Sequence, residues 1–566
     1  MGSFNDFIER RQRDDWFWIA LICLACALIM IDFPLEGVPD GYDLAQHLRF
    51  AASYHDAILN GSFIPFWAAG DNLGFGSVGV RFYPPLADYV LAVTQIFTND
   101  WYKSFWLNSV FWMFPGCIGV YLWVKQFRSR AIAAAAAVIY ALMPYHLLQV
   151  YRLQLYSEFV AASILPFCFL FATRVVKRGR ISDVLGLAIS CSLILLTHIP
   201  TSLAGFAGLG LYSVFIIDWK NPLRSISRFA LAIAISIASA AFYLIRLATE
   251  LSWVRHNTDE FSSGFFDYRH HLFPIFNNFG DGYWDFSLWL LDLSTILILL
   301  ALLPLPFCAL WGSAAKSRSV IESKVLIAVS VTGFFSIFMV SSLSGFIWRA
   351  SGALQRIQFP WRFLSLAMLM GAVAITLTLS YGRFSRLIIY SSIALVFVTL
   401  VFDLTQTVLT AGPLTRERFF EKVVDKRTDE GCACWWPTAA RKEAFENTEQ
   451  VFAENRRIDI ARWEPEDRVF TVYDGAPTDV RVATFYYPYW KATVNDRPTE
   501  VRMDNNGAIV IPVQAGGARV RLSFEEPYIN RIMLYLSSAT WLILLLAAIL
   551  LGFLKLQHRF RPPKES

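Results

Sequence analysis

A polar loop over residues 34–87 interrupts an otherwise hydrophobic chain and holds its most reactive side chains. Asp43 and His47 are four residues apart, so on a short helix they share one face. A carboxylate beside an imidazole can act as a general base or hold a ligand. Asp40 or Asp43 could instead cap a helix through Leu44–Leu59, and capping is favoured for Asp40. For Asp43, placed beside His47, we favour a catalytic role.

A second group of polar residues joins two apolar runs. Glu158 falls in the first turn of the run that follows Arg152, at bilayer depth. An ionisable group there is costly and usually faces a cavity or a partner. A structural Arg152–Glu158 ion pair is the alternative.

The third group, Arg356-Ile-Gln-Phe-Pro-Trp-Arg362, directly precedes another apolar run. Guanidinium groups match phosphate oxygens, and aromatic neighbours suit the membrane interface. The segment therefore suits a phosphate whose lipid tail lies in the bilayer. The alternative is structural: the arginines extend their charged ends to the membrane surface, beside a belt of aromatic residues, and bind no ligand.

Composition places these groups in a membrane protein. Of 566 residues, 55% are hydrophobic and only 17% are charged. Several apolar runs reach the ~20 residues that a helix needs to cross a bilayer. The net charge is only +5, and the basic residues lie in short clusters between apolar runs. Nothing therefore indicates nucleic-acid binding.

Those basic clusters predict the topology, because lysine and arginine favour cytoplasmic loops. Twelve spans with both chain ends in the cytoplasm place every cluster inside, provided that the weaker run 86–97 does not cross. The predicted spans are 16–33, 104–124, 131–150, 156–173, 181–198, 201–217, 229–247, 286–311, 325–346, 363–379, 387–402 and 532–554.

The region 410–530 differs in composition from the rest of the chain. It is charged, and its apolar and polar residues alternate as in strands, over 468–473, 480–487, 490–494, 508–513 and 518–524. Asn495-Asp496 and Gly516-Gly517 are expected turns. We predict a small extracytoplasmic β-sandwich between a membrane domain (1–409) and a last span with a basic tail (531–566).

Of the eight cysteines, only Cys432 and Cys434 lie in this outer region. A disulfide between them is possible in an oxidising compartment, and the sequence leaves its presence open. A zinc site would need more ligands than this neighbourhood holds.

Several short motifs together resemble a known family. They are Asp43-x-x-x-His47, Pro65-x-Trp67, Asn72-x-Gly74-x-Gly76, Phe82-Tyr-Pro-Pro-Leu86, Tyr151-Arg152 with Glu158, and Gln358-Phe-Pro-Trp-Arg-Phe363. The chain resembles the bacterial membrane-protein family labelled "6-pyruvoyl-tetrahydropterin synthase-related", which is similar to YfhO-type proteins and belongs with the GT-C glycosyltransferases. The stretch 486–492 resembles an outer-domain hairpin of that family, although Tyr489 replaces the usual glycine and Asp496-Arg497 replaces Asp-Gly.

The resemblance implies a GT-C-like fold and transfer of a sugar from a polyprenyl-phosphate carrier to a glycan or lipid acceptor. Asp43 would deprotonate the acceptor hydroxyl, with inversion, and His47 would orient it. Arg152, Arg356 and Arg362 would bind the donor phosphate. No cofactor is required, and a divalent metal near Asp40, Asp43 and His47 is the alternative. The expected substrate-binding residues are Asp40, Tyr83, Glu158, Gln358 and Trp361.

The expected location is the bacterial cytoplasmic membrane, with the site facing the periplasm or exterior. Two other functions would also fit a membrane chain with intramembrane charges. A transporter or flippase would more often show two similar halves, and no such symmetry is evident. A non-catalytic envelope-assembly protein would keep the β-domain but would not need Asp43.

Overall fold

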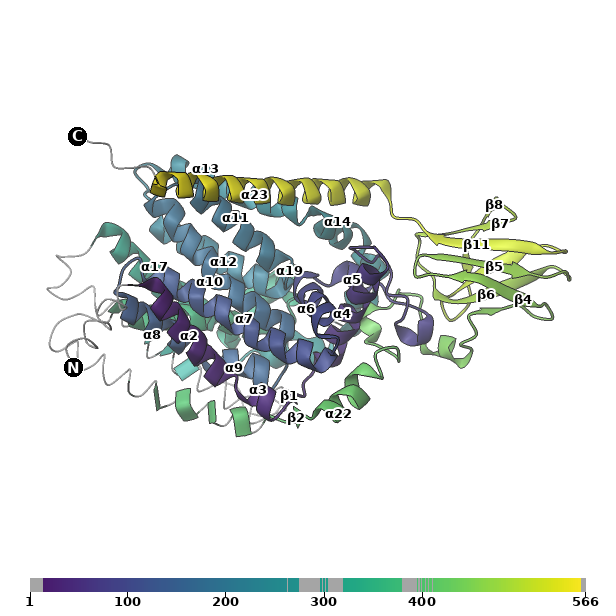
Figure 1. Ribbon diagram of the computed structural model, residues 1–566, viewed down its shortest axis with the longest axis horizontal. Helices are drawn as coiled ribbons and strands as arrows, with labels where there is room; N and C mark the ends of the chain where they lie inside the picture. Colours follow the sequence, from purple (N-terminus) through teal and green to yellow (C-terminus); the bar gives the residue numbers. More distant parts are fainter. Residues whose placement is uncertain are drawn as a thin grey trace.

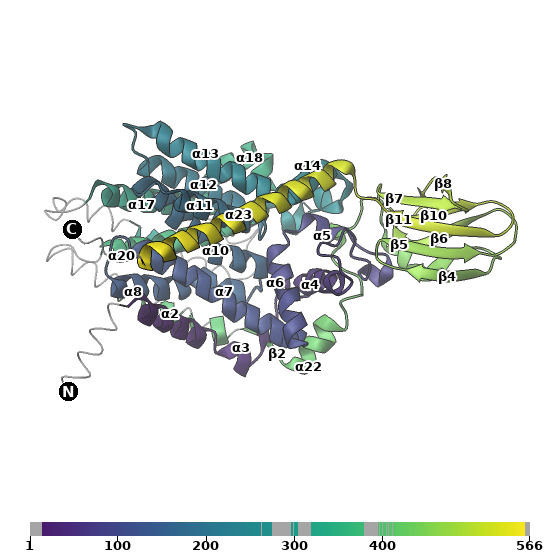
Figure 2. The same ribbon diagram turned by 45° about the horizontal axis from the view of Figure 1, so that its top comes forward.

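The computed structural model describes residues 14–261, 263–273, 319–378 and 411–560, with isolated residues within 296–303 and 394–409. A body of helices forms one part of the molecule, and a β-domain extends from one end of it (Figure 1). Helices α4 (Leu44–Leu59) and α5 (Gly79–Phe82) of the first loop lie where the helical body meets the β-domain. Figure 2 shows the same arrangement after rotation, with α23 running the length of the body.

Apolar sequence produces most of the helical body. Among the described helices, seven are long and apolar enough to cross a membrane, or eight if the bent pair α8 and α9 is one span. The predicted runs 286–311 and 387–402 lie largely outside the described residues, so the count of twelve stays a prediction. The helices are α2 (Asp15–Ile29), α6 (Leu86–Thr98), α7 (Trp101–Val124), α8 (Arg130–Ala141), α9 (Pro144–Tyr151), α10 (Tyr156–Lys177), α11 (Ile181–Leu195), α12 (Ile199–Ile216), α13 (Pro222–Ser239), α14 (Ala241–Glu250), α17 (Val320–Val340), α20 (Phe363–Thr378) and α23 (Tyr528–Phe560).

Two predicted runs differ from the observed helices. The run 131–150 is bent by 48° between α8 and α9, where Pro144 begins the second helix and cannot continue the hydrogen bonds of the first. The run 229–247 is divided at Ala240, so its last residues belong to the separate helix α14. Helix α6, expected not to cross, has 13 residues and rises only about 20 Å.

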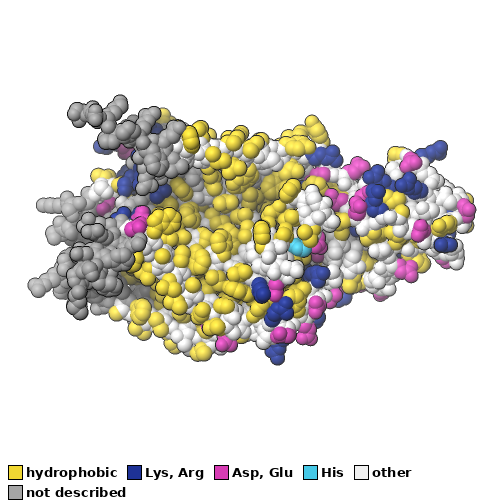
Figure 3. Space-filling view, viewed as in Figure 1, with side chains coloured by type: hydrophobic (Ala, Val, Ile, Leu, Met, Phe, Trp, Pro, Cys, Tyr) yellow, Lys and Arg dark blue, Asp and Glu magenta, His cyan; other side chains and the backbone are white. Residues whose placement is uncertain are grey.

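The surface follows the same division. In Figure 3, hydrophobic side chains cover much of the helical body, whereas charged side chains gather on the β-domain and beside the first loop. This distribution is the one expected for a body surrounded by lipid and a domain surrounded by water.

The predicted β-rich domain is confirmed and consists of two antiparallel sheets. One has the strand order β3-β6-β10-β9 and the other β4-β5-β11-β7-β8. Inward-facing side chains of both sheets, among them Phe470, Val482, Ile511 and Leu522, share one hydrophobic core. The strands are β3 (Val451–Phe452), β4 (Ile458–Trp463), β5 (Asp467–Val472), β6 (Thr478–Phe485), β7 (Trp490–Val494), β8 (Arg497–Thr499), β9 (Arg502–Met503), β10 (Ala508–Val513) and β11 (Ala518–Phe524).

The turn between β7 and β8 keeps a tight hairpin without the glycine that is usual there. Asn495 and Asp496 adopt φ angles of 50° and 61°. Asparagine and aspartate tolerate this left-handed conformation better than other non-glycine residues. The replacement of Asp-Gly by Asp496-Arg497 is therefore accommodated by placing Asn495 and Asp496 at the two left-handed positions.

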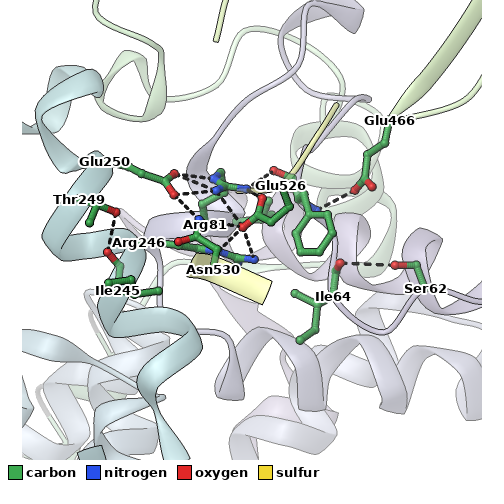
Figure 4. A network of polar contacts seen from close by, with 12 residues as sticks. Ser62, Ile64, Arg81, Ile245, Arg246, Thr249, Glu250, Glu466, Glu526 and Asn530 are labelled. Carbon is green, nitrogen blue, oxygen red and sulfur yellow. Dashed lines mark hydrogen bonds and ion pairs between the residues drawn. The ribbon is translucent and has the colours of Figure 1, made fainter. Parts of the chain in front are cut away.

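A buried ionic network joins the β-domain to the first loop and to α14 (Figure 4). The Arg81 guanidinium lies 2.8 Å from Glu250 and 2.7 Å from Glu526, and Glu526 also pairs with Arg246 at 3.0 Å. The Asn530 amide donates to both glutamates. Two arginines and two glutamates balance their charges, which is how buried ions are tolerated.

Aromatic rings of the β-domain cover the same guanidinium. Tyr487, Tyr489 and Phe524 lie 5.3–5.7 Å from the Arg81 carbon. Tyr489, which departs from the family motif, thus contributes a cation–π contact at the domain junction. Because Arg81 belongs to α5, the junction also fixes the loop segment that continues into Phe82 and Tyr83.

Candidate active site

The turn that carries Asp43 is held on both sides. Strand β1 (Val38–Pro39) pairs with β2 (Pro413–Leu414), and the Tyr42 amide donates to the Leu153 carbonyl at 3.1 Å. Gly41 packs so closely that an added Cβ would lie 2.6 Å from both the Leu153 oxygen and the Gln154 Cβ. The position of Asp43 is therefore set by contacts with distant parts of the chain.

Asp43 occupies the N-cap position of helix α4, but its side chain makes no capping hydrogen bond. Asp40 does not cap it either, so the capping predicted for Asp40 is wrong. His47 lies one turn after Asp43, and its Nδ1 is 2.8 Å from the Asp88 carboxylate. His47 and Asp88 are only 2% and 1% exposed. Asp43 and His47 both line the cavity described below, whereas Asp88, which binds His47, is not part of its lining.

Electrostatics couples these groups. Burial raises the pKa of Asp43, and the positive charges of His47 and Arg362 oppose that rise. Burial alone would lower the pKa of His47, but Asp88 and Asp43 outweigh it, so the pKa of His47 is raised. His47 is thus favoured as an imidazolium, and its charge favours the ionised form of Asp43.

A cavity of about 760 Å³ opens in front of Asp43. It lies between the first loop, the helical body and the segment that leads into the β-domain. Polar and aromatic residues from all of these parts line it, including Asp43, Gln46, His47, Tyr83, His198, His256, Asn257, Arg356, Gln358, Trp361, Arg362 and Trp435. Chain segments more than 300 residues apart therefore build one site.

The cationic wall of the cavity comes from the segment before α20. Arg362 places its guanidinium over Phe359 at 4.9 Å, and the Trp361 ring stacks on Phe359 at 4.6 Å. Gln358 is held by a 2.9 Å bond from its amide to the Phe261 carbonyl. Arg356 is exposed and has no ion pair with any described residue. This wall offers one anchored and one accessible guanidinium to an anion.

Glu158 lies behind that wall and does not line the cavity. It accepts hydrogen bonds from Tyr145 at 2.6 Å and Gln149 at 2.9 Å, and it lies 3.4 Å from the Arg362 guanidinium. The alternative Arg152–Glu158 pair is therefore wrong: Glu158 pairs with Arg362. Its geometry suits positioning of Arg362 rather than direct contact with a sugar.

Arg152 and Asp40 line a second pocket of about 460 Å³ instead of the main cavity. Asp40 pairs there with Lys422. Tyr42 and Leu153 line both pockets and separate them. The structure thus does not bring Arg152 together with Arg356 and Arg362.

The same separation bears on metal binding. Within the described residues, no three His, Cys, Asp or Glu side chains are grouped to hold a metal ion. Asp40 is paired in the second pocket, so Asp40, Asp43 and His47 do not form a ligand set.

The glycine motif of the loop makes structural contacts, whereas Phe82, Tyr83 and Pro84 of the proline motif line the cavity. Gly76 has a φ of +80° and packs against Trp67, leaving no room for a side chain. The Asn72 side chain binds the Gly76 carbonyl, the Gly431 amide and the Trp436 indole. Residues 72–76 therefore attach the loop to the segment before the β-domain and do not line the cavity.

Sequence reasoning missed several residues of the site. Asp88 is the most important, because it holds His47. An aspartate within the weakly apolar run 86–97 was the available signal, since a charge at that depth needs a partner. His256, Asn257 and Trp435 gave no comparable signal, because each lies in an irregular segment.

The fold bears a partial likeness to solved membrane transferases. The mycobacterial arabinofuranosyltransferase AftD matches with a TM-score of 0.40 and 14% identity, over 70% of this chain and 26% of that chain. The Archaeoglobus fulgidus oligosaccharyltransferase gives 0.40 and 14%, over 71% and 57%. ArnT from Cupriavidus metallidurans, bound to undecaprenyl phosphate, gives 0.32 and 12%, over 63% and 77%. This chain thus spans about a quarter of the length of AftD.

At the level of sequence, no curated protein matches the chain. A family model does match, over residues 80–410, which is more than half of the chain. Its description is "6-pyruvoyl-tetrahydropterin synthase related domain; membrane protein". The match covers Asp88, the Glu158–Arg362 pair and the cationic wall, whereas Asp43 and His47 lie before it. The chain therefore belongs to the family of membrane proteins described as 6-pyruvoyl-tetrahydropterin synthase related.

Proposed function

We propose that the protein is a glycosyltransferase that moves a monosaccharide from a polyprenyl-phosphate carrier to an envelope glycan or lipid on the outer face of the cytoplasmic membrane. One observation carries the proposal: the carboxylate of Asp43, backed by His47 and Asp88, shares a cavity with the guanidinium groups of Arg356 and Arg362. The motif resemblance given above supports the same reaction.

The proposed reaction is a single inverting displacement. The acceptor hydroxyl oxygen attacks the anomeric carbon and gives its proton to Asp43. The bond between that carbon and the phosphate oxygen breaks, and the electron pair leaves with the lipid phosphate. A phosphate is already a stable anion, so the leaving group requires no strong acid.

The cationic wall supplies the electrostatic part of this mechanism. Arg362, held by Glu158 and Phe359, would bind the phosphate, and Arg356 would add a second charge at the accessible side. The placement of Glu158 suggests that it orients Arg362. Gln358, Trp361 and Tyr83 line the cavity and are proposed to contact substrate.

The surroundings of the cavity suit a lipid-linked donor. Leu203 of α12 and Phe265 line it and are 43% and 45% exposed. We propose that the cavity opens toward the lipid at these apolar side chains, which would contact the carrier chain. We also propose that the chain crosses the membrane twelve times and that the β-domain is a sandwich outside the membrane. That domain would select the acceptor.

The test is mass spectrometry of envelope glycans and of polyprenyl-phosphate sugars, in wild type, a deletion strain and Asp43→Asn. Loss of one hexose or pentose with accumulation of its lipid carrier in both mutants is expected. An intact glycan profile in Asp43→Asn contradicts the catalytic role. Lipid-linked material trapped on the inner face would instead indicate a flippase.

Because the proposed reaction requires no metal ion, EDTA should leave the rate of sugar transfer unchanged. A loss of activity that Mg²⁺ or Mn²⁺ restores would contradict this expectation.

A further inference from the structure

A strap formed by residues 426–438 crosses the side of the cavity next to the β-domain. On one side, the Arg49 guanidinium donates to the carbonyls of Lys426, Arg427 and Asp429 at 2.6–2.9 Å. On the other, the Arg255 amide donates to the Trp436 carbonyl and the Thr438 amide to the Trp253 carbonyl, both at 3.0 Å. The strap is thus fixed to both the first loop and the segment after α14.

The centre of the strap is a short disulfide-closed turn facing the cavity. Cys432 and Cys434 are joined, which answers the question that the sequence left open, and both line the cavity. The Cys432 amide lies 3.4 Å from the Gln46 side chain, one turn along α4 from Asp43. The turn ends at Trp435, so the disulfide and Gln46 together set the position of that ring.

Trp435 belongs to an aromatic wall of the cavity. Its ring centre lies 4.9 Å from His256, 5.8 Å from Tyr83 and 6.0 Å from Phe50. All four rings line the cavity. The mechanism proposed above gives Trp435, His256 and Phe50 no role.

A polar group without a partner lies beside this wall. The amide oxygen of Asn257 is buried and has no hydrogen-bond partner among the described residues. Asn257 also lines the cavity, next to His256. A buried acceptor left unpaired is unfavourable, so a ligand hydroxyl that donates to it would be stabilised there.

We propose that Trp435 and Asn257 form a subsite for an uncharged sugar ring. A sugar ring has an apolar C–H face, which packs on an aromatic surface, and a rim of hydroxyl groups, one of which would donate to Asn257. This inference rests on the proposed function and deepens it. The ring is that of either the donor sugar or the acceptor sugar.

The test measures binding without catalysis. Saturation-transfer NMR is recorded on the full chain in lipid nanodiscs with neutral methyl pentosides and hexosides. At least one should bind wild type and Asp43→Asn alike, and its affinity should fall at least tenfold in Trp435→Ala and in Asn257→Ala. Trp435→Phe should retain most of the affinity. Trp436→Phe is the matched control, since Trp436 packs on Phe445 and Phe485.

Each outcome has a separate meaning. No sugar signal in wild type, or unchanged affinity in both Trp435→Ala and Asn257→Ala, overturns the subsite. Competition by a sugar-loaded polyprenyl phosphate assigns the subsite to the donor sugar, and binding together with it assigns the acceptor sugar. If the glycan product persists in Asp43→Asn while Trp435→Ala loses sugar binding, the proposed mechanism fails and the subsite stands.

Discussion

The imidazole of His47 lies 2.8 Å from the carboxylate of Asp88, although the two residues are 41 positions apart in the chain. Asp43 lies one helical turn before His47, and the charges of both carboxylates favour the protonated form of the imidazole. This arrangement makes Asp88 a positioning residue whose charge reaches Asp43 through His47.

Asp88→Asn should shift the pH dependence of transfer. Removing the Asp88 charge relieves its repulsion of Asp43, but it also makes His47 less readily protonated, so ionised Asp43 loses a stabilising neighbour. Because the charge of His47 acts on Asp43 more strongly than that of Asp88, we expect the pKa of Asp43 to rise further. A base acts in its ionised form, so activity is lost as pH falls through that pKa. The acidic limb of the kcat/KM profile should therefore move to higher pH in the variant. An unmoved limb would contradict the coupling.

Asp43→Asn should lower kcat at least ~1000-fold, within the range attributed to a general base. The measurement is turnover of the sugar identified by mass spectrometry, with the purified protein in nanodiscs. Asp56→Asn is the control, because Asp56 is on the same helix and is 72% exposed. Equal activity in the two variants would remove Asp43 from the mechanism.

Arg356→Ala should raise the KM for the lipid-linked donor by about tenfold, since one charge-assisted bond to phosphate contributes roughly 1.5–3 kcal/mol. The KM for the acceptor should not change. Arg349→Ala serves as the control, because Arg349 is an exposed arginine in the same segment between α17 and α20. A donor KM that is the same in both variants argues against a phosphate site at Arg356.

Arg81→Ala should destabilise the domain junction by roughly 3–5 kcal/mol, because it leaves Glu250 and Glu526 buried without their main partner. Denaturant unfolding in detergent, followed by β-domain fluorescence, measures this loss. Arg416→Ala is the comparison, since Arg416 pairs with Asp100 while 54% exposed and should cost about 1 kcal/mol or less. An equal loss of unfolding free energy in the two variants would show that the buried network stabilises the protein no more than an exposed ion pair does.

Gly41→Ala should reduce transfer at least ~100-fold while the chain still folds, because the added Cβ displaces the turn before Asp43. Gly70→Ala has open space around it and should behave as wild type. Size-exclusion elution and the unfolding midpoint establish that both variants are folded. Full activity in Gly41→Ala would mean that the turn tolerates movement.

The sequence by itself determined the elements whose causes are local. Apolar runs and strand alternation depend on neighbouring residues, and so α4 and the strands β5, β6, β7, β10 and β11 lie where the pattern indicated, within two residues. The four-residue spacing likewise placed Asp43 and His47 on one helical face. The arginines before α20 were recognisable because charge beside an apolar run is unusual.

Tertiary structure alone decided which of these groups meet. Nothing local in the chain indicated that Glu158 pairs with Arg362 instead of Arg152, or that Arg152 and Asp40 belong to a second pocket. The same holds for Asp88 behind His47 and for Trp435 on a strap nearly 400 residues after Asp43. The partner of a charged group depends on how helices bend and pack, as at Pro144, and packing is a property of the whole chain rather than of any segment of it.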